Sequence, residues 1–190
     1  APHRNYRTYI SESLNTLTQL PGATIVSLDS TAPHSAIVNG RIRKSQLRFA
    51  AASFEAAVEG DIKILVTHHN LSKAPEEQSG KVLPGFERCL SAFSEMGVEL
   101  VLGGHLHRTF WASYPPVLPG GAFSRSVSIV HTGTTTSKRG RGEERGRNSL
   151  NLIRISKEEV WVVPHLLDTE AGVFVPKEGF RIARGRRGES

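Results

Sequence analysis

Two short stretches of the chain place histidines directly after apolar runs. In "ILVTHHN", His68 and His69 follow the run 62–67. In "LVLGGHLH", two glycines separate the apolar residues from His105 and His107. Histidine is the commonest metal ligand in proteins and the usual proton carrier near neutral pH. These stretches are therefore the part of the sequence best suited to metal-dependent or acid–base chemistry.

The apolar runs before these histidines are predicted to be neighbouring parallel strands. A single amphipathic helix, predicted over 86–96 and ended by Gly97, joins them. Sites in α/β sheets form at the carboxyl ends of strands. We therefore expect the imidazoles of His68, His105 and His107 to converge. The last two would point to one side of the sheet if that segment is extended.

The remaining sequence alternates helices with apolar strands and then becomes rich in strands. Further helices are expected over 4–20 and 43–59, and further strands over 23–29 and 98–102. From Thr109 onward, stretches such as "SVSIVHTG" and "VWVVPHLL" predict an antiparallel sheet. The pattern predicts an α/β layered architecture.

Composition limits the class of protein. The chain has 190 residues, 38% of them hydrophobic, which is enough for one domain with a real core. No apolar stretch reaches the length of a membrane span, so we expect no membrane partner. The only cysteine, Cys89, cannot form an internal disulfide and is expected to be a buried apolar side chain. Cysteine usage favours the cytoplasm.

The net charge of +6 is concentrated in two segments. The loop 138–147, "KRGRGEERGR", and the tail 177–190 each hold five basic and two acidic residues. The rest of the chain is neutral, so there is no global basic face and nucleic acid is not the expected partner. We expect the loop to be solvated and flexible. The alternative is that Arg139 or Arg141 helps to bind a phosphate-bearing substrate.

The histidine stretches resemble a known family. "VTHHN" and "LVLGGHLH" are similar to the last two signature blocks of the calcineurin-like metallophosphoesterases. Bacterial cyclic nucleotide phosphodiesterase-like members also have blocks similar to "RNYRTYI", "IVSLDST" and "HTGTTTSKRGRGEERGRNSLNLI". The resemblance covers most of residues 1–175. It implies an α/β fold, namely the C-terminal portion of a four-layer α/β/β/α metallophosphoesterase sandwich.

The resemblance also implies a binuclear metal site. His68 and His105 match ligands of one divalent metal ion, and His107 matches a ligand of the other. Mn, Fe, Zn and Co are the candidate metals. In the family, a metal-bound hydroxide attacks the phosphorus of a phosphomonoester or phosphodiester. The implied partner is a small-molecule phosphate ester or a nucleotide.

Three family motifs are missing: Asp-x-His, a strand followed by Gly-Asp, and Gly-Asn-His-Asp or Gly-Asn-His-Glu. The only aspartates are Asp29, Asp61 and Asp168, and Asn70 replaces a frequent proline. We therefore expect residues 1–175 to be the C-terminal part of the domain in a longer enzyme and 176–190 to be a flexible basic tail. The chain alone is expected to be inactive. The alternative is a binding or structural module that keeps the fold without catalysis.

Other histidines carry weaker patterns. His69 is expected to lie exposed or behind the ligands, although direct contact with substrate is the alternative. His131, at the end of an expected strand, is expected on the sheet surface rather than at the mouth of the site. His3, His34 and His165 have no supporting pattern. Trp111 and Trp161 are expected to serve packing.

Overall fold

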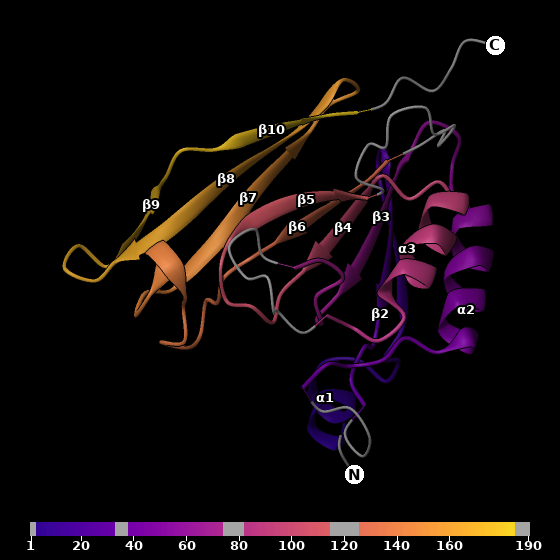
Figure 1. The fold of residues 1–190 in the computed structure, drawn as a ribbon, viewed down its shortest axis with the longest axis horizontal. Helices are drawn as coiled ribbons and strands as arrows, with labels where there is room; N and C mark the ends of the chain where they lie inside the picture. Colours follow the sequence, from indigo (N-terminus) through magenta and orange to yellow (C-terminus); the bar gives the residue numbers. More distant parts are fainter. Residues whose placement is uncertain (1–2, 33–37, 74–81, 115–125, 185–190) are drawn as a thin grey trace.

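Two β-sheets stacked face to face, with helices on one side, form the fold (Figure 1). The computed structural model describes residues 3–32, 38–73, 82–114 and 126–184. The first sheet has the order β1-β2-β3-β4-β6-β5. Its strands are β1 (Thr16–Leu20), β2 (Ala23–Leu28), β3 (Ile62–Thr67), β4 (Leu100–Gly103), β5 (Phe110–Tyr114) and β6 (Val127–His131). The expected α/β class is confirmed.

The centre of the first sheet is parallel. β2, β3, β4 and β6 run in the same direction, while β1 and β5 pair antiparallel at the two edges. The expected strands 23–29 and 62–67 appear as β2 and β3, and β3 lies beside β4 as predicted. Their carboxyl ends therefore meet at one edge of the sheet.

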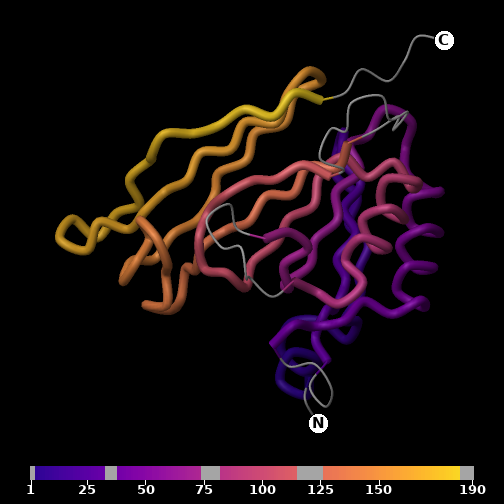
Figure 2. Tube along the Cα trace, in the orientation of Figure 1, coloured from indigo at the N-terminus to yellow at the C-terminus, as the bar shows by residue number. Residues whose placement is uncertain are grey.

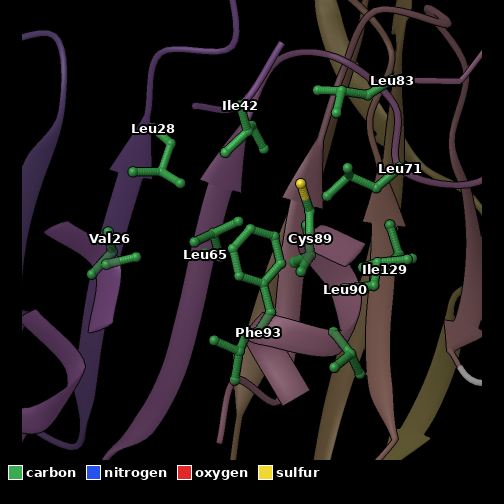
Figure 3. Close-up of a cluster of buried hydrophobic side chains, with 14 of the residues drawn as sticks. Val26, Leu28, Ile42, Leu65, Leu71, Leu83, Cys89, Leu90, Phe93 and Ile129 are labelled. Carbon is green, nitrogen blue, oxygen red and sulfur yellow. The ribbon is translucent and has the colours of Figure 1, made fainter. Parts of the chain in front are cut away.

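Helices α2 (Lys44–Glu55) and α3 (Phe86–Glu95) cover one face of this sheet (Figures 1 and 3). Phe54 of α2 and Phe93 of α3 are at most 1% exposed and pack against strand residues such as Leu65. Cys89 is fully buried in the same cluster, as expected. Gly97 follows α3 with a φ of 76°, a left-handed conformation that glycine adopts without strain.

The second sheet covers the opposite face of the first. It contains β7 (Ser149–Ile155), β8 (Glu159–Asp168), β9 (Val173–Pro176) and β10 (Phe180–Ala183). Alternate residues of β8 point inward, so that Val160 and Val162 pack against Ile62 and Ile64. Figure 2 shows these strands, in orange and yellow, lying together on one side of the molecule. The described part of the chain thus forms helix, sheet and sheet layers.

The helix expected over 4–20 is wrong. Only α1 (Arg4–Tyr9) is helical, and β1 follows as an edge strand that pairs with β2. The turn between the strands uses Gly22, which has a φ of 81°. Thr16 and Thr18 are β-branched residues that favour strands. Ladder hydrogen bonds to β2 outweigh the helical spacing of the apolar residues.

The ordered sheet continues beyond the boundary expected at residue 175. β9 ends at Pro176 and β10 pairs antiparallel with β8, while Arg184 forms an ion pair with Glu99 at 2.9 Å. Pro176 and the strand Phe180–Ala183, both within the expected tail, therefore belong to the second sheet. The last six residues lie outside the described part. None of the helices in the described ranges has the length and apolarity needed to span a membrane.

Candidate metal centre

The carboxyl ends of β3 and β4 bring two of the predicted histidines together. Val66 pairs with Leu102 in the parallel ladder, and the backbone N–H of Gly104 donates to the carbonyl of His68 at 3.1 Å. Beyond this hydrogen bond, Nε2 of His68 lies 3.3 Å from Nδ1 of His105. Two nitrogen donors from different strands thus face each other at the open edge of the sheet.

The segment after β4 is not extended. His105 and His107 have φ angles of 66° and 55°, in the left-handed region that non-glycine residues rarely adopt. The expectation that both side chains point to one side of the sheet required an extended segment, so it does not apply here. A conformation of this kind costs about 1–3 kcal/mol per residue and persists only where the surroundings impose it. Such strain is typical of functional sites.

His69 is the third member of the cluster. Candidate ligand atoms of His68, His69 and His105 all lie within 4.8 Å of one another. Contrary to the expectation of an exposed or peripheral residue, His69 is only 3% exposed and sits beside the other two imidazoles. Three nitrogens at this spacing form a donor set that fits one divalent cation. In the sequence, only the adjacent pair His68-His69 pointed to His69 as a candidate ligand.

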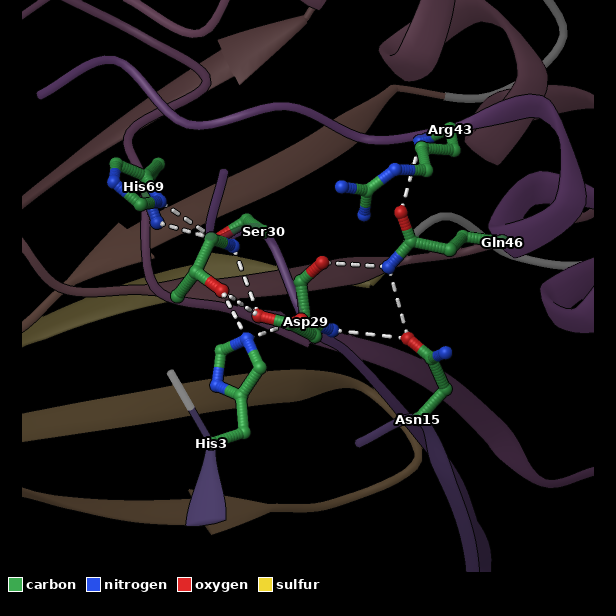
Figure 4. A network of polar contacts seen from close by, with 8 residues as sticks. His3, Asn15, Asp29, Ser30, Arg43, Gln46 and His69 are labelled. Carbon is green, nitrogen blue, oxygen red and sulfur yellow. Dashed lines mark hydrogen bonds and ion pairs between the residues drawn. The ribbon is translucent and has the colours of Figure 1, made fainter. Parts of the chain in front are cut away.

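Ser30 fixes the orientation of His69 (Figure 4). The Ser30 hydroxyl oxygen lies 2.8 Å from Nδ1 of His69 and accepts the backbone N–H of the same residue at 3.1 Å. Gly40 packs against the same ring, where any Cβ would overlap the imidazole. These contacts engage Nδ1 of His69 and fix the orientation of its ring.

A polar network holds Asp29, the residue before Ser30 (Figure 4). Gln46, in the first turn of α2, donates to the carbonyl of Asp29 at 2.6 Å and to the side chain of Asn15 at 2.9 Å. The Asn15 side chain accepts the backbone N–H of Asp29 at 3.0 Å. Residues from three separate parts of the chain therefore determine where His69 lies.

We expect Ser30→Ala to lower the free energy of unfolding by about 1–2 kcal/mol, because a buried backbone N–H and a buried imidazole nitrogen lose their partner. Urea denaturation at neutral pH measures the change. Ser13→Ala, at an exposed position, is the control and should change stability by less than about 0.5 kcal/mol. Equal stability of the two variants would show that the Ser30 hydrogen bonds do not hold His69.

His107 lies apart from the three clustered imidazoles. It does not belong to the group of mutually close ligand atoms. Its Nδ1 donates to the carbonyl of Arg139 at 3.3 Å, and its own carbonyl accepts the N–H of Arg141 at 3.0 Å. The predicted convergence of all three histidines is thus realised for His68 and His105 only. A carbonyl partner on Nδ1 leaves the lone pair of His107 Nε2 available.

Burial lowers the pKa of two of the clustered histidines, His68 and His105, and so favours their neutral forms. Desolvation, followed by the nearby His69, His105 and His107, lowers the pKa of His68 from 6.5 to about 4. Desolvation is also the largest cause that lowers the pKa of His105, and His69, His107 and Arg141 act in the same direction. Neutral imidazoles are the form that binds metals. The site is therefore ready to donate nitrogen lone pairs at neutral pH.

His131 is buried in the interior, which corrects the expectation of a sheet-surface histidine. It is 0% exposed and stacks on Phe110, with ring centroids 4.4 Å apart and an interplanar angle of 13°. Its Nδ1 donates to the carbonyl of Gly104 at 3.2 Å, so Nε2 accepts the hydroxyl of Ser72 at 3.2 Å. A Cβ on Gly103 would come within 3.0 Å of this ring. His131 therefore supports the Gly-Gly turn that leads into His105.

The basic loop 138–147 is anchored by one carboxylate. Glu144, in the short helix η1 (Gly142–Glu144), is 5% exposed and accepts the backbone N–H of Thr109 and the hydroxyl of Ser149. Gly133 and Gly140 pack so closely against Glu144 and its neighbours that a Cβ at either position would overlap them. Apart from Gly140 and Glu144, residues 138–147 are exposed, as expected of a solvated loop, while Glu144 ties it to Thr109 and Ser149. The loop reaches His107 through the contacts of Arg139 and Arg141.

Comparison with known proteins identifies the fold only. No protein family matches the sequence, and no curated protein does so. PhoD has a similar fold, with a TM-score of 0.64 over 90% of this chain and 11% sequence identity. GAP50, the anchor in the inner membrane complex of Plasmodium, gives 0.49 over 90% with 12% identity. Zinc-complexed Vps29 of Entamoeba histolytica gives 0.35 over 89% with 10% identity.

The chain matches only part of each of these structures: 42% of the PhoD chain, 54% of the GAP50 chain and 59% of the Vps29 chain. PhoD is a metallophosphoesterase-fold protein, so the present chain has a metallophosphoesterase-like α/β sandwich fold. At this level of identity, the likeness concerns architecture and not activity.

Proposed function

We propose that this chain supplies histidine ligands to a divalent-metal centre that hydrolyses a phosphate ester in a longer protein. The observation that carries the proposal is the approach of His68 and His105 at the ends of adjacent parallel strands, with nitrogens 3.3 Å apart. The histidine blocks resemble those of calcineurin-like metallophosphoesterases, and the fold is of that kind. A phosphomonoester or a phosphodiester is the proposed substrate.

His68, His69 and His105 would hold one cation, and His107 would contribute to a second. A nitrogen donor set suits Zn, Co or Fe, and Mn becomes favourable where carboxylates complete the site. A divalent cation in this place supplies Lewis-acid stabilisation of the charge that develops on the phosphoryl oxygens. The role of this chain is to present neutral imidazoles in a fixed orientation.

The same donor set explains why we expect the chain alone to hydrolyse little or no substrate. Among the described residues, the cluster that can hold a metal contains three histidines and no carboxylate. Two cations held close together repel each other unless anionic ligands lie between them. The chain by itself would therefore bind one cation weakly. If no further ligands complete the site, the chain would bind a partner or serve a structural role without catalysis, which is the second candidate function.

Titration with Co²⁺, followed by visible absorption and calorimetry, tests the metal site. Removing a residue that only hydrogen-bonds to a metal ligand typically weakens metal binding 10–100-fold. We expect His105→Ala and His68→Ala, which remove the ligands themselves, to weaken Co²⁺ binding by more than this. His69→Ala should act similarly, while His107→Ala should have the smaller effect on the first cation. His165→Ala, on the second sheet, is the matched control and should bind like the unmodified chain.

Unchanged Co²⁺ affinity in His68→Ala and His105→Ala would overturn the proposal. A chromogenic phosphodiester assay with added Mn²⁺, Zn²⁺ or Co²⁺ extends the test to activity. Robust turnover by the chain alone, lost in His105→Ala, would show that it builds a complete site. In that case the proposal that further ligands come from a longer protein would be wrong.

A further inference from the structure

A cavity opens beside the metal centre, on the face of the first sheet that α2 and α3 do not cover. Its volume is about 480 Å³, within the range of small-molecule sites. His68 and Gly104 line it, and Nε2 of His68 lies 3.3 Å from Nδ1 of His105. The cavity and the candidate metal centre therefore share a wall, formed by His68.

The floor of the cavity comes from three neighbouring parallel strands. Ser27 of β2 pairs with Val66 of β3, which pairs with Leu102 of β4, so the three side chains lie on the same face of the sheet. Val66 and Leu102 pack against the core between the two sheets, yet all three residues remain partly exposed. The second sheet thus leaves this end of the face open, and its apolar side chains are accessible.

Residues near the start of the chain form another wall. Tyr6 of α1 and Leu14, which precedes β1, line the cavity, and Figure 1 shows α1 at the edge of the sheet where β2 ends. Tyr6 is 40% exposed. An aromatic ring that is partly exposed on the wall of a cavity with apolar residues in its floor is suited to packing against another ring.

The polar lining does not favour an anion. Asp29 carries a negative charge, and no lysine or arginine is among the described lining residues. One oxygen of Asp29 accepts the backbone N–H and the hydroxyl of Thr31 at 2.9 and 2.6 Å, and the other lies 3.7 Å from Nε2 of His3. A protonated His3 would only balance this charge. An uncharged group is therefore the kind of ligand that the cavity fits.

We propose that this cavity binds an uncharged apolar group, such as one or two fused rings, between Tyr6 and the floor formed by Val66 and Leu102. In the complete protein this group is the organic part of the ester, whose phosphate lies on the metal held at His68. The second statement rests on the proposed function, whereas apolar binding in the cavity does not. The cavity then selects bulky apolar esters over small polar ones.

Binding of 2-naphthol to the metal-free chain tests the cavity. A phenolic hydroxyl of this kind is uncharged at pH 7. Calorimetry in the presence of EDTA measures the affinity. Tyr6→Ala should weaken binding about three- to tenfold, because packing between two aromatic rings is worth about that factor, and Tyr6→Phe should keep it. Ser27→Ile should weaken binding at least about tenfold, because the larger side chain fills the space that the probe occupies.

Tyr9→Ala is the matched control. Tyr9 lies on the same helix as Tyr6 but is 81% exposed and outside the cavity lining, so this variant should bind 2-naphthol like the unmodified chain. Circular dichroism establishes that each variant is folded. Unchanged affinity in folded Tyr6→Ala and Ser27→Ile variants would overturn the proposal. A dimer in sedimentation that dissociates in Tyr6→Ala would also overturn it, because the cavity would then be an interface between two copies.

A second measurement tests the link to the metal centre. With Co²⁺ bound, 2-naphthyl phosphate should bind at least about tenfold more tightly than methyl phosphate, because its rings bury more apolar area in the cavity. Ser27→Ile should remove this preference. Equal affinity for the two phosphates, in a chain that binds both Co²⁺ and 2-naphthol, would overturn the assignment of the apolar group to the ester.

The cavity and the metal centre fail separately in these experiments. His105→Ala should lose Co²⁺ binding yet keep its affinity for 2-naphthol, because His105 does not line the cavity. Binding of 2-naphthol without Co²⁺ binding in the unmodified chain would reject the metal centre and support the cavity. Co²⁺ binding without 2-naphthol binding would reject the cavity and leave the metal centre.

Discussion

Glu144→Ala is expected to lower the free energy of unfolding by about 3 kcal/mol, because two buried donors lose a charged acceptor at the same time. The carboxylate binds the backbone N–H of Thr109 and the hydroxyl of Ser149, and the side chain is 5% exposed. Water has little access to replace either hydrogen bond. Urea denaturation at pH 7 measures the loss, and hydrogen exchange of the Thr109 amide should become faster.

Glu143→Ala is the matched control for this prediction. Glu143 precedes Glu144 in η1 but is exposed, so its removal should change stability by less than about 0.5 kcal/mol. Glu144→Gln keeps the shape and one acceptor oxygen, and it should fall between the two. If Glu144→Ala were as stable as Glu143→Ala, the buried carboxylate would not anchor the loop, and the ordering of residues 138–147 would need another cause.

The strands that carry the candidate site were predictable from local sequence. β3 has the predicted bounds, since "IKILVT" is a continuous apolar run that suits a strand buried on both faces. The crossover helix and the position of β4 beside β3 followed from chain order and the usual handedness of such connections. Placing His68 and His105 at one sheet edge therefore required no information about distant residues.

The surroundings of His69 and His131 depend on contacts between distant segments. Burial of His69 requires Ser30, which lies 39 residues earlier in the chain. Burial of His131 requires Ser72, which lies 59 residues away. A histidine at a strand end has the same local pattern whether it is exposed or enclosed. Pattern analysis alone could therefore identify these residues but not their environments.

The loop 138–147 contains a contact that its composition did not predict. Seven of its ten residues are charged and the other three are glycines, a composition typical of flexible segments. In the structure, Gly140 is required for the close approach of the backbone to Glu144, and the carboxylate of Glu144 turns inward. One buried, hydrogen-bonded carboxylate thus connects a segment without apolar side chains to the rest of the fold.

The candidate site therefore depends on two levels of structure. The parallel strands deliver His68 and His105 to one edge, and hydrogen bonds from the surrounding segments set the orientation of the rings. Ser30 acts on His69, the carbonyl of Arg139 acts on His107, and His131 acts on the Gly103–Gly104 turn. Changes in these supporting residues should alter the metal centre without removing a ligand.

Acid should destabilise the protein through His131 in particular. Desolvation by burial lowers the pKa of His131 from 6.5 to about 4 in the folded state. The unfolded chain therefore binds more protons between these values, and the stability due to the neutral imidazole is fully present above pH 6.5 and lost as the pH falls toward 4. The difference in pKa corresponds to about 3 kcal/mol over this window.

Urea denaturation at pH 7 and pH 4.5 measures this loss. His131→Asn, whose amide can still donate to the carbonyl of Gly104, should be less stable at pH 7 but lose about 2–3 kcal/mol less between the two pH values. His165→Asn is the control and should follow the unmodified protein, since His165 lies on the second sheet with its Nδ1 donating to Val163 at 3.0 Å. Other groups that titrate in this range, including His68, are common to all three proteins and cancel in the comparison.

If His131→Asn lost as much stability as the unmodified protein on acidification, the ring would not be held neutral by burial. Its contacts with Gly104 and Ser72 would then have to be compatible with a charged imidazole.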